Sequence, residues 1–518
     1  MSNSTTFDLL RRLGTFTSTA RLLGPAAFVV FASYLPAVAQ ETTGLEAAAA
    51  LENLLVRAIE RSEASVVSIA RFQREPGEVA GNPFQPEFIP RPGIVINPLG
   101  DTSSAQPSSP EFVPNEFSTG VVIDKGGVIV TTYHAVVSPG EIWVTTTARR
   151  PLQAKVLAAD PRSDLAVLKV IDAAPDVEFK PITFGDPTKL KKGQIVIALG
   201  NPYAIARDGQ ASASWGIIAN LARKAGPNGT PADDARDRKS TLHHFGTLIQ
   251  TDAKLNLGTS GGALLNLKGE MIGLTTSQAA VAGFEQAAGY AIPCDEVFRR
   301  VVDTLKQGKE VDYGLLGIQL RPLSPVETAA GLRGVRVADV IYGSPAEKAG
   351  IRSGDVITQV AGKPIADVDG LMLQVGSKPA ASDTTVTVER DGRSFNVPVT
   401  LAKYEVRGKK IVTAPDPGWR GLAVDFPSAH RQMRPQFQGP FEVRAPTIDP
   451  AVLSVDVATD SPAWRAGLRQ GMFITHVRNV PVSTPKEFYA QVAALEGTVE
   501  LRVTAPPGQP PVVKVPAE

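Results

Sequence analysis

The last third of the chain contains one sequence twice, and this repeat limits the folds that the chain can adopt. Ser344–Ile365 reads SPAEKAGIRSGDVITQVAGKPI and Ser461–Val482 reads SPAWRAGLRQGMFITHVRNVPV, so 11 of 22 aligned positions are identical without a gap. Duplication of one module explains such similarity far better than chance does. Each copy predicts a strand, a short helix that begins at Ser-Pro, an Ala-Gly stop and a second strand. The chain therefore ends in two copies of one module, which we place at 310–404 and 418–518.

The chain is too long for a single hydrophobic core. Its 518 residues predict about three domains. The 53 basic and 52 acidic side chains leave a net charge of +1. Because this balance gives no general attraction to polyanions, we expect no nucleic-acid partner and no binding to an anionic membrane surface.

Side chains that commonly bind metals are few. Cys294 is the only cysteine, which excludes an intrachain disulfide and a thiolate metal cluster, and we expect it to be a small buried side chain. None of the five histidines has the HxxxH or HxH spacing of a metal site, and the adjacent His243 and His244 lie in a polar stretch. We therefore expect no metal and no cofactor.

The first 39 residues have the pattern of a secretory signal peptide. Three arginines precede an apolar run from Leu22 to Ala39, which ends in Ala-Val-Ala before Gln40. The run contains two prolines and is short for a membrane span of about 20 residues. We expect cleavage after Ala39 and a periplasmic or secreted mature chain. An uncleaved membrane anchor is the alternative.

From Phe117 to Thr276 the sequence is typical of an all-β domain, with short apolar runs between turn residues. A helix at Leu45–Arg61 and a strand at Ser65–Ala70 precede it, and an amphipathic helix at Pro293–Lys306 follows. The predicted strands are Gly120–Asp124, Val128–Thr132, Ile142–Thr147, Gln153–Ala159, Leu165–Val170, Gln194–Leu199, Ala213–Ala219, Leu248–Thr251, Ala263–Leu265 and Met271–Thr276. This pattern favours β-barrels or a β-sandwich.

Two segments in this region have loop composition. Pro76–Pro114 contains nine prolines in 39 residues, so we predict a long extended loop over 76–116. It is either a solvated linker or a mobile loop that gates a site. Lys224–Lys239 is polar and rich in Gly, Pro and Asp, which predicts a surface loop.

A glycine-rich turn surrounds Ser260 in the sequence Gly258-Thr-Ser-Gly-Gly262. Glycines allow backbone conformations that side chains forbid, and they let a substrate carbonyl approach closely. Such a turn suits a nucleophilic hydroxyl, with the N–H groups of Gly258 and Ser260 available for the carbonyl oxygen. A glycine-rich hairpin with an incidental serine is the alternative when the motif is taken alone.

A serine nucleophile needs a base and a carboxylate that orients the base. His134 lies at the end of the predicted strand Val128–Thr132, and Asp164 immediately precedes the buried run that starts at Leu165. Each alone has a simple structural interpretation, as a packed histidine or as a residue that ends a strand. Together with Ser260 they have the chain order His, Asp, Ser of a known catalytic triad.

These segments resemble the HtrA/Deg (DegP-like) serine proteases. The motifs are STGVVIDKGGVIVTTYHAVV, DPRSDLAVLKV, GQIVIALGNPY, QTDAKLNLGTSGGALLNLKGEMIGL and GYAIP, followed by the two repeats. The resemblance implies a mainly β fold, in which a chymotrypsin/trypsin-like double β-barrel domain at 40–309 is followed by two α+β PDZ domains and a flexible linker at 405–417. It implies that His134 is the general base, Asp164 the orienting carboxylate and Ser260 the nucleophile. The N–H groups of Gly258 and Ser260 become the oxyanion hole.

The chain departs from the family pattern beside the serine. Thr259 and Ala263 stand where the family usually has Asn and Pro, and we expect Thr259 to supply the same backbone N–H. Lys254 occupies the position of the floor of the specificity pocket in trypsin-like enzymes, so a preference for basic substrate side chains is not supported. Leu255 matches a pocket-lining position, which implies a preference for small or medium apolar residues.

The repeats resemble PDZ domains, which bind a C-terminal or extended segment by strand addition. Leu315, Leu316, Gly317 and Ile318 match the carboxylate-binding loop of the first PDZ domain, and Trp419–Ala423 matches that of the second. In the second copy Met472 replaces Asp355, and Phe426–Pro450 has the character of an insertion. The second copy is therefore the weaker candidate for peptide binding. A role in spacing or assembly is the alternative for both.

The resemblance implies an ATP-independent endopeptidase of the cell envelope that degrades misfolded or unfolded proteins. PDZ domains would bind substrate tails, and the chain would form a homotrimer or a larger assembly of trimers. The sequence contains no GxxxxGK[ST] loop that would bind ATP. Two alternatives stay open: a protease-fold chaperone or scaffold with weak or no catalysis, and a regulatory protease that makes one signalling cut.

Overall fold

The computed structural model describes residues 44–72, 116–201, 209–224, 241–256, 258–276, 288–415, 418–430, 451–504 and 512–517. The predicted signal peptide at 1–39 lies outside these ranges. So do nearly all of the predicted loop at 76–116, the loop at 225–240 and most of the predicted insertion after Phe426. None of the described helices is long and apolar enough to cross a membrane.

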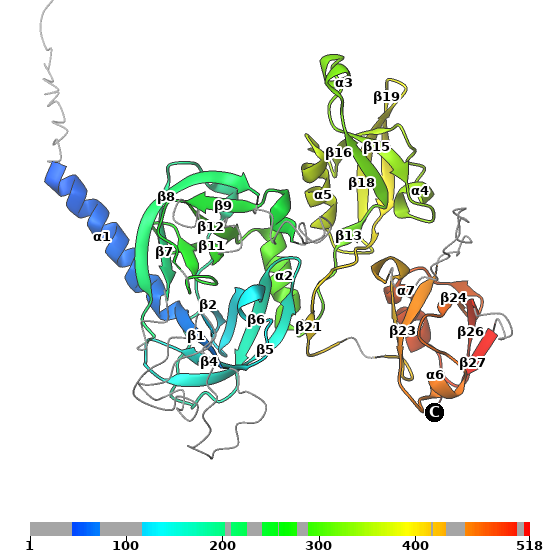
Figure 1. Cartoon of the computed structure of the whole chain (residues 1–518). Helices are drawn as coiled ribbons and strands as arrows, with labels where there is room; N and C mark the ends of the chain where they lie inside the picture. Colours follow the sequence, from blue (N-terminus) through cyan, green and yellow to red (C-terminus); the bar gives the residue numbers. More distant parts are fainter. Residues whose placement is uncertain are drawn as a thin grey trace, which may run out of the picture. The chain divides into compact units, whose positions relative to one another are not determined.

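The first domain begins with a helix and a six-stranded barrel (Figure 1). Helix α1 spans Gly44–Ser62 and leads through the 3-10 turn η1, Glu63–Ser65, into the barrel. The strands are β1 (Val66–Phe72), β2 (Glu116–Asp124), β3 (Val128–Thr132), β4 (Glu141–Thr145), β5 (Pro151–Asp160) and β6 (Leu165–Val170). They follow the order β5-β4-β1-β2-β3-β6, and β5 pairs with β6 to close the barrel.

A second closed barrel follows, with the strand order β10-β11-β12-β9-β8-β7. Its strands are β7 (Ile195–Gly200), β8 (Ser212–Arg223), β9 (Leu248–Thr251), β10 (Ala263–Leu265), β11 (Met271–Thr276) and β12 (Gly289–Pro293). Helix α2, Glu296–Lys306, comes next, and Asp295 caps it by accepting the N–H of Phe298 at 3.0 Å. Phe298 and Leu305 of α2 join one core with residues of both barrels, such as Val121 and Leu199. Burial of this shared apolar surface holds the barrels together.

The two repeats fold into modules with the same order of strands, and helix α3 of the first has the 3-10 turn η7, Pro427–Ala429, at its place in the second. The first contains β14 (Ile318–Pro322), α3 (Pro325–Ala329), β15 (Val335–Val340), α4 (Pro345–Lys348), β16 (Val356–Val360), β17 (Lys363–Pro364), α5 (Val368–Gly376), β18 (Asp383–Arg390) and β19 (Arg393–Thr400). The second contains β22 (Leu422–Asp425), β23 (Val452–Val457), α6 (Pro462–Arg465), β24 (Phe473–Val477), β25 (Val480–Pro481), α7 (Pro485–Ala493), β26 (Val499–Thr504) and β27 (Val512–Val515). The sheet orders β14-β15-β16-β18-β19 and β22-β23-β24-β26-β27 correspond strand by strand.

The repeated Ser-Pro dipeptide begins a short helix in each module, as the sequence predicts. The side chain of Ser344 accepts the N–H of Glu347, and that of Ser461 accepts the N–H of Trp464. Each serine thereby satisfies one of the backbone donors that a helix start leaves unpaired, and the proline that follows needs no partner for its missing N–H. The fold class predicted from the sequence is confirmed: two β-barrels followed by two α+β modules.

Three local predictions were wrong or incomplete. Part of the segment predicted as a flexible linker forms β21, Ile411–Val412, which pairs with β5 of the first barrel. The segment Gly289–Pro293, noted only as a motif, is strand β12. The polar stretch around His243 and His244 is the short helix η6, Leu242–Phe245, and both histidines are buried.

Candidate active site

The structure brings His134 and Asp164 into direct contact. Strand β3 ends at Thr132, and the 3-10 turn η3, Tyr133–Ala135, carries His134 away from the strand. Nδ1 of His134 lies 3.0 Å from both carboxylate oxygens of Asp164, and the backbone N–H of His134 donates to Oδ1 at 3.2 Å. The carboxylate therefore fixes both the position of the ring and the nitrogen that carries its proton.

Asp164 is held from several sides. It lies in the left-handed backbone region, with φ +55°, in the turn between β5 and β6. Its carbonyl accepts the N–H of Tyr133 at 3.0 Å, and its side chain is fully buried. Thr276 Oγ1, at the end of β11 in the second barrel, donates to Asp164 Oδ2 at 3.2 Å. Both barrels thus contribute donors to this carboxylate, which compensates for its burial.

The surroundings of His134 favour its protonated form. Burial alone would lower the pKa of His134, but the charge of Asp164 and the hydrogen bond to it outweigh burial, so the pKa lies above the ordinary value of 6.5. A histidine in this setting can accept a proton, and Asp164 stabilises the imidazolium that results. This arrangement can perform general-base chemistry on a hydroxyl group.

Ser260 lies in the turn between β9 and β10 and is connected to the first barrel through its backbone. Its carbonyl accepts the N–H of Thr119 at 2.9 Å. Thr119 belongs to β2, which pairs with β3, the strand that leads to His134. The same threonine donates its hydroxyl to the carbonyl of Gly258 at 2.7 Å and accepts the N–H of Asn201 at 2.9 Å. Thr119 therefore binds the serine turn at two points.

Two glycines beside Ser260 are required by the backbone, Gly261 by space and Gly258 by its conformation. Gly261 has φ +84°, and a Cβ at this position would lie 2.1 Å from the carbonyl oxygen of Thr119 and 2.3 Å from Thr131 Oγ1. Gly258 also has a positive φ of +92°. Any side chain at position 261 would push β2 away from the turn. Gly261 therefore allows β2 to approach the serine turn closely. The approach of a substrate carbonyl to Ser260 stays a prediction.

The structure corrects the expectation for Thr259 and locates two residues that the sequence linked to the specificity pocket, Lys254 and Leu255. The N–H of Thr259 is used inside the turn, where it donates to the carbonyl of Asn256 at 3.1 Å, so this donor is not available as expected. Lys254 is exposed, and its carbonyl accepts the hydroxyl of Ser214 at 2.9 Å. Leu255 packs against Gly289 of β12, where a Cβ would lie 2.7 Å from Leu255 Cδ1. This contact places Leu255 at the side of the second barrel.

His243 supports the loop that carries Asp164, a role that its sequence context did not indicate. Its Nε2 lies 2.8 Å from the carbonyl of Ser163, and its Nδ1 lies 2.7 Å from Thr247 Oγ1. A carbonyl only accepts, so Nε2 carries the proton. Burial lowers the pKa of His243 despite the nearby charge of Asp164, which keeps the ring neutral. Among the described residues no group of three or more His, Cys, Asp or Glu could hold a metal ion.

The predicted carboxylate-binding loop of the first module begins its edge strand. The carbonyl of Leu316 accepts the N–H of Ala346, and that of Gly317 accepts the N–H of Ile341, each at 3.0 Å. Gly317 has φ +81°, and a Cβ there would lie 2.3 Å from Cβ of Ser344. Ile318 is the first residue of β14, which forms one edge of its sheet. Leu315 lies in the short strand β13, Gly314–Leu315, which pairs with β20, Ala402–Lys403.

Comparisons with known proteins agree with this architecture. The family model of the trypsin-like peptidase domain matches residues 118–274, and that of the PDZ domain matches residues 314–401. A probable periplasmic serine endoprotease DegP-like from Chlamydia trachomatis is 32% identical over 375 residues, which cover 71% of this chain and 68% of that protein. The protein of the same description from Pseudomonas fluorescens is 28% identical over 456 residues, covering 86% and 89% of the two chains.

Solved structures with a similar fold include the HtrA-type protease AlgW with a decapeptide. That structure is 23% identical to this chain, with a TM-score of 0.47, and the match covers 67% of this chain and 98% of that one. The likeness to the DegP-like proteins and the two domain matches define the family. This chain belongs to the HtrA family of DegP-like, trypsin-like serine endoproteases with PDZ domains.

Proposed function

We propose that this serine endoprotease cleaves peptide bonds through His134, Asp164 and Ser260. The hydrogen-bonded pair of His134 and Asp164 carries the proposal, because it gives a neutral imidazole the orientation of a general base. Ser260 is the nucleophile, which transfers its proton to His134 as it attacks the substrate carbonyl. The N–H groups of Gly258 and Ser260 stabilise the oxyanion. Leu255 contributes to an apolar specificity pocket.

Misfolded or unfolded proteins of the cell envelope are the proposed substrates. The catalytic domain extends over 40–309 and contains no ATP-binding loop, so a substrate has to arrive already extended. The first PDZ domain, at 310–404, takes a C-terminal or extended segment along the open edge of β14. Support comes from the structure named above, an HtrA-type protease solved with a decapeptide. Strand addition to such an edge provides affinity through backbone hydrogen bonds.

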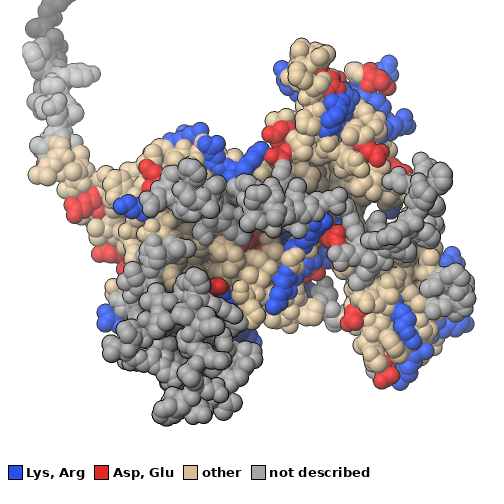
Figure 2. Space-filling model, viewed as in Figure 1, with Lys and Arg blue, Asp and Glu red and all other residues tan. Residues whose placement is uncertain are grey.

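The proposed location is the periplasm, reached through the signal peptide at 1–39 and its cleavage. The periplasmic descriptions of the similar proteins support this location. Basic and acidic side chains are interspersed on the described surface drawn in Figure 2, and the net charge is +1. We therefore propose protein substrates and no nucleic-acid partner.

The proposed assembly is a homotrimer or a larger oligomer of trimers. Apolar side chains exposed on α1, such as Leu54 and Val56, provide surface that an oligomer would bury. Light scattering of the mature chain, 40–518, measures the assembly directly.

Digestion of casein by the mature chain tests the catalytic proposal. Ser260→Ala and Asp164→Asn should each lower the rate by a factor of about 10⁴ or more. Ser212→Ala, an exposed serine on β8, is the matched control and should keep full activity. Equal cleavage by the wild-type chain and by Ser260→Ala would exclude Ser260 as the nucleophile. Added ATP should not change the rate.

The same assay separates the alternatives. A chaperone or scaffold would prevent casein aggregation without cleaving it, in the wild-type chain as in Ser260→Ala. A regulatory protease would cleave few proteins in a periplasmic extract, whereas a degradative one would cleave many unfolded proteins at sites with apolar side chains. The intact His134–Asp164 contact favours an active protease.

A further inference from the structure

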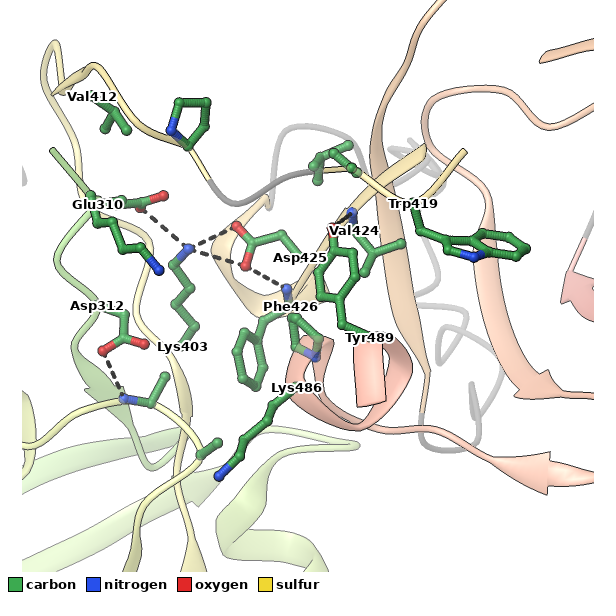
Figure 3. Close-up of a pocket in the computed structure, with 18 of the residues that line it drawn as sticks. Glu310, Asp312, Lys403, Val412, Trp419, Val424, Asp425, Phe426, Lys486 and Tyr489 are labelled. Atoms are coloured by element: carbon green, nitrogen blue, oxygen red, sulfur yellow. Dashed lines mark hydrogen bonds and ion pairs between the residues drawn. The ribbon is translucent and has the colours of Figure 1, made fainter. Parts of the chain in front are cut away.

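The second module has a groove between its edge strand and its helix, in the same place as a PDZ peptide site. Strand β22, Leu422–Asp425, forms one edge of the sheet, and α7, Pro485–Ala493, lies beside it. Both belong to the lining of a cavity of about 840 Å³ (Figure 3). Residues of the first module and of the connecting segment complete that lining, among them Glu310, Lys403 and Val412.

The backbone donors along β22 are already used within the chain. The N–H of Leu422 donates to the carbonyl of Trp419 at 2.9 Å, and that of Val424 donates to the hydroxyl of Tyr489 on α7 at 3.1 Å. The N–H of Phe426 donates to Asp425 Oδ1 at 2.8 Å. Strand addition needs donors of this kind from the edge strand. A peptide would have to displace Tyr489 before it could pair with β22.

The first module differs at the matching position of its helix. Helices α5, Val368–Gly376, and α7 have the same length, and Met372 holds the place in α5 that Tyr489 holds in α7. The thioether of methionine is only a weak hydrogen-bond acceptor, whereas the tyrosine hydroxyl accepts strongly. Leu320 is the third residue of β14, as Val424 is of β22. The Tyr489 contact is therefore specific to the second module.

A buried ion pair lies in the same cavity. The ammonium of Lys403, in the short strand β20 of the first module, lies 2.9 Å from a carboxylate oxygen of Asp425, the last residue of β22. Lys403 is 7% exposed, and its backbone carbonyl accepts the hydroxyl of Ser428 at 2.7 Å. Figure 3 shows Lys403 between Glu310 and Asp425. The lysine thus connects to the second module through both its side chain and its backbone.

The charges of this pair stabilise each other. Burial alone would raise the pKa of Asp425, but the hydrogen bond from His430 and the charge of Lys403 outweigh it and lower the pKa to about 2. Burial would lower the pKa of Lys403, but Asp425 and Glu310 raise it above its ordinary value. Both groups therefore stay charged at neutral pH, and neither is readily separated from its partner.

We propose that the groove between β22 and α7 is an intramolecular docking site for the Lys403 segment of the same chain. The ammonium of Lys403 meets Asp425 at one end of the groove. Along the strand edge, Tyr489 of the groove's own helix takes the N–H of Val424. In this state the second module does not recruit substrate tails. It stays attached to the first module, whose own edge strand β14 remains the peptide site. Docking of the second module does not involve the proposed catalytic residues.

Amide hydrogen exchange of the mature chain in the Ser260→Ala background tests the docking. We expect the Val424 amide to exchange about fivefold faster in Tyr489→Phe. This is the change in the opening equilibrium that the loss of one typical hydrogen bond produces. Lys403 lies outside the second module, and Lys403→Gln should increase the exchange rate of the Val424 amide to a similar extent. Met372→Leu is the matched change in the first module and should leave the Leu320 amide unaffected. Amides of β24 report whether the module stays folded in each variant.

A peptide probe provides the second readout. Fluorescence anisotropy would follow a labelled decapeptide of glycine and serine that ends in three valines with a free carboxyl group. We expect the double variant Tyr489→Phe with Lys403→Gln to bind at least fivefold more of this probe through the second module than the parent does. A Val424 amide that exchanges equally fast in the parent and in both single variants would overturn the proposal. So would probe binding to the second module of the parent chain at the strength of the double variant.

Discussion

Tyr313 donates its hydroxyl to the carboxylate of Asp160, the last residue of β5, just before the turn that carries the proposed catalytic Asp164. Tyr313 precedes the first strand of the PDZ module, and its side chain is fully buried. Asp160 also accepts the N–H and the hydroxyl of Ser163, at 2.9 and 2.6 Å. Burial raises the pKa of Asp160, and these hydrogen bonds only partly oppose it. The donor from Tyr313 therefore matters to a buried group with a high desolvation cost.

Tyr313→Phe should lower the free energy of unfolding by about 1–3 kcal/mol, because it leaves part of a buried carboxylate unsatisfied. The rate of casein cleavage should also fall, since the loop that carries Asp164 loses an anchor. Thermal unfolding and casein digestion measure the two effects. Tyr342→Phe, at a tyrosine that is 40% exposed, is the control and should change neither. An unchanged melting temperature for Tyr313→Phe would contradict this account.

The pH dependence of cleavage should reflect the pKa of His134. The base has to be neutral to accept the proton of Ser260, and the pKa of His134 lies above 6.5, since the charge of Asp164 outweighs burial. Activity should therefore rise with pH through a midpoint above 6.5. Measurement of kcat/KM on a chromogenic peptide between about pH 5 and about pH 9 would locate this midpoint.

Glu116 offers a check on the electrostatic part of this prediction. Its charge contributes to raising the pKa of His134, so Glu116→Gln should move the midpoint to lower pH. Glu500→Gln, at a half-exposed position in the second module, should leave it unchanged. A midpoint at or below 6.5 in the wild-type chain would show that burial, not Asp164, controls the histidine.

The parts of the fold that local pattern determines were predictable from the sequence. Leu165–Val170 was predicted as a strand and is β6, and its apolar run Leu165–Leu168 is buried, as an uninterrupted apolar run at this length favours. The order of His134, Asp164 and Ser260 suggested a triad, and the first two residues are in contact. Both observations depend on features that a short stretch of sequence contains.

Features that depend on distant partners were not predictable. Ile411 and Val412 lie in a Lys- and Pro-bearing segment that gives no strand signal. They pair with Ala158 and Ala159 because β4 pairs only with residues 151–154 of β5 and leaves the rest of that edge open. Thr119 is one of several polar residues of β2, and its hydrogen bonds to Gly258 and Ser260 exist only in the folded chain. The burial of His243 is compensated because its Nε2–H donates a hydrogen bond to the carbonyl of Ser163, a contact that sequence spacing does not indicate.

Gly261 should tolerate substitution poorly. Gly261→Ala adds a Cβ that would lie 2.1 Å from a carbonyl oxygen, at a φ of +84°. Gly193→Ala is the matched control, because Gly193 has φ +86° but nothing within 4 Å of its Cβ position. The control should cost about 1 kcal/mol for the backbone conformation alone. Gly261→Ala should cost at least about 3 kcal/mol and abolish cleavage.

Urea unfolding of both glycine variants, together with casein digestion, separates the two costs. The difference between the variants measures the steric part, since the conformational part is shared. Equal stability of Gly261→Ala and Gly193→Ala would mean that β2 can move away from the serine turn without loss. In that case the close approach of Thr119 would not be needed to hold Ser260.

Asp355 and Arg390 form a bidentate ion pair in the first module, and Met472 replaces the aspartate in the second. Asp355 is buried, and its two oxygens lie 2.6 and 2.7 Å from nitrogens of Arg390. Asp355→Met, the residue of the second module, removes the carboxylate and leaves the guanidinium without its partner. The first module should lose about 3 kcal/mol of stability and bind tail peptides more weakly, because fewer modules are folded.

Asp383→Asn, at an exposed position of the same sheet, is the control. Thermal unfolding and peptide anisotropy measure the two effects. A first module as stable with methionine as with aspartate would show that packing, not the ion pair, holds β16 against β18.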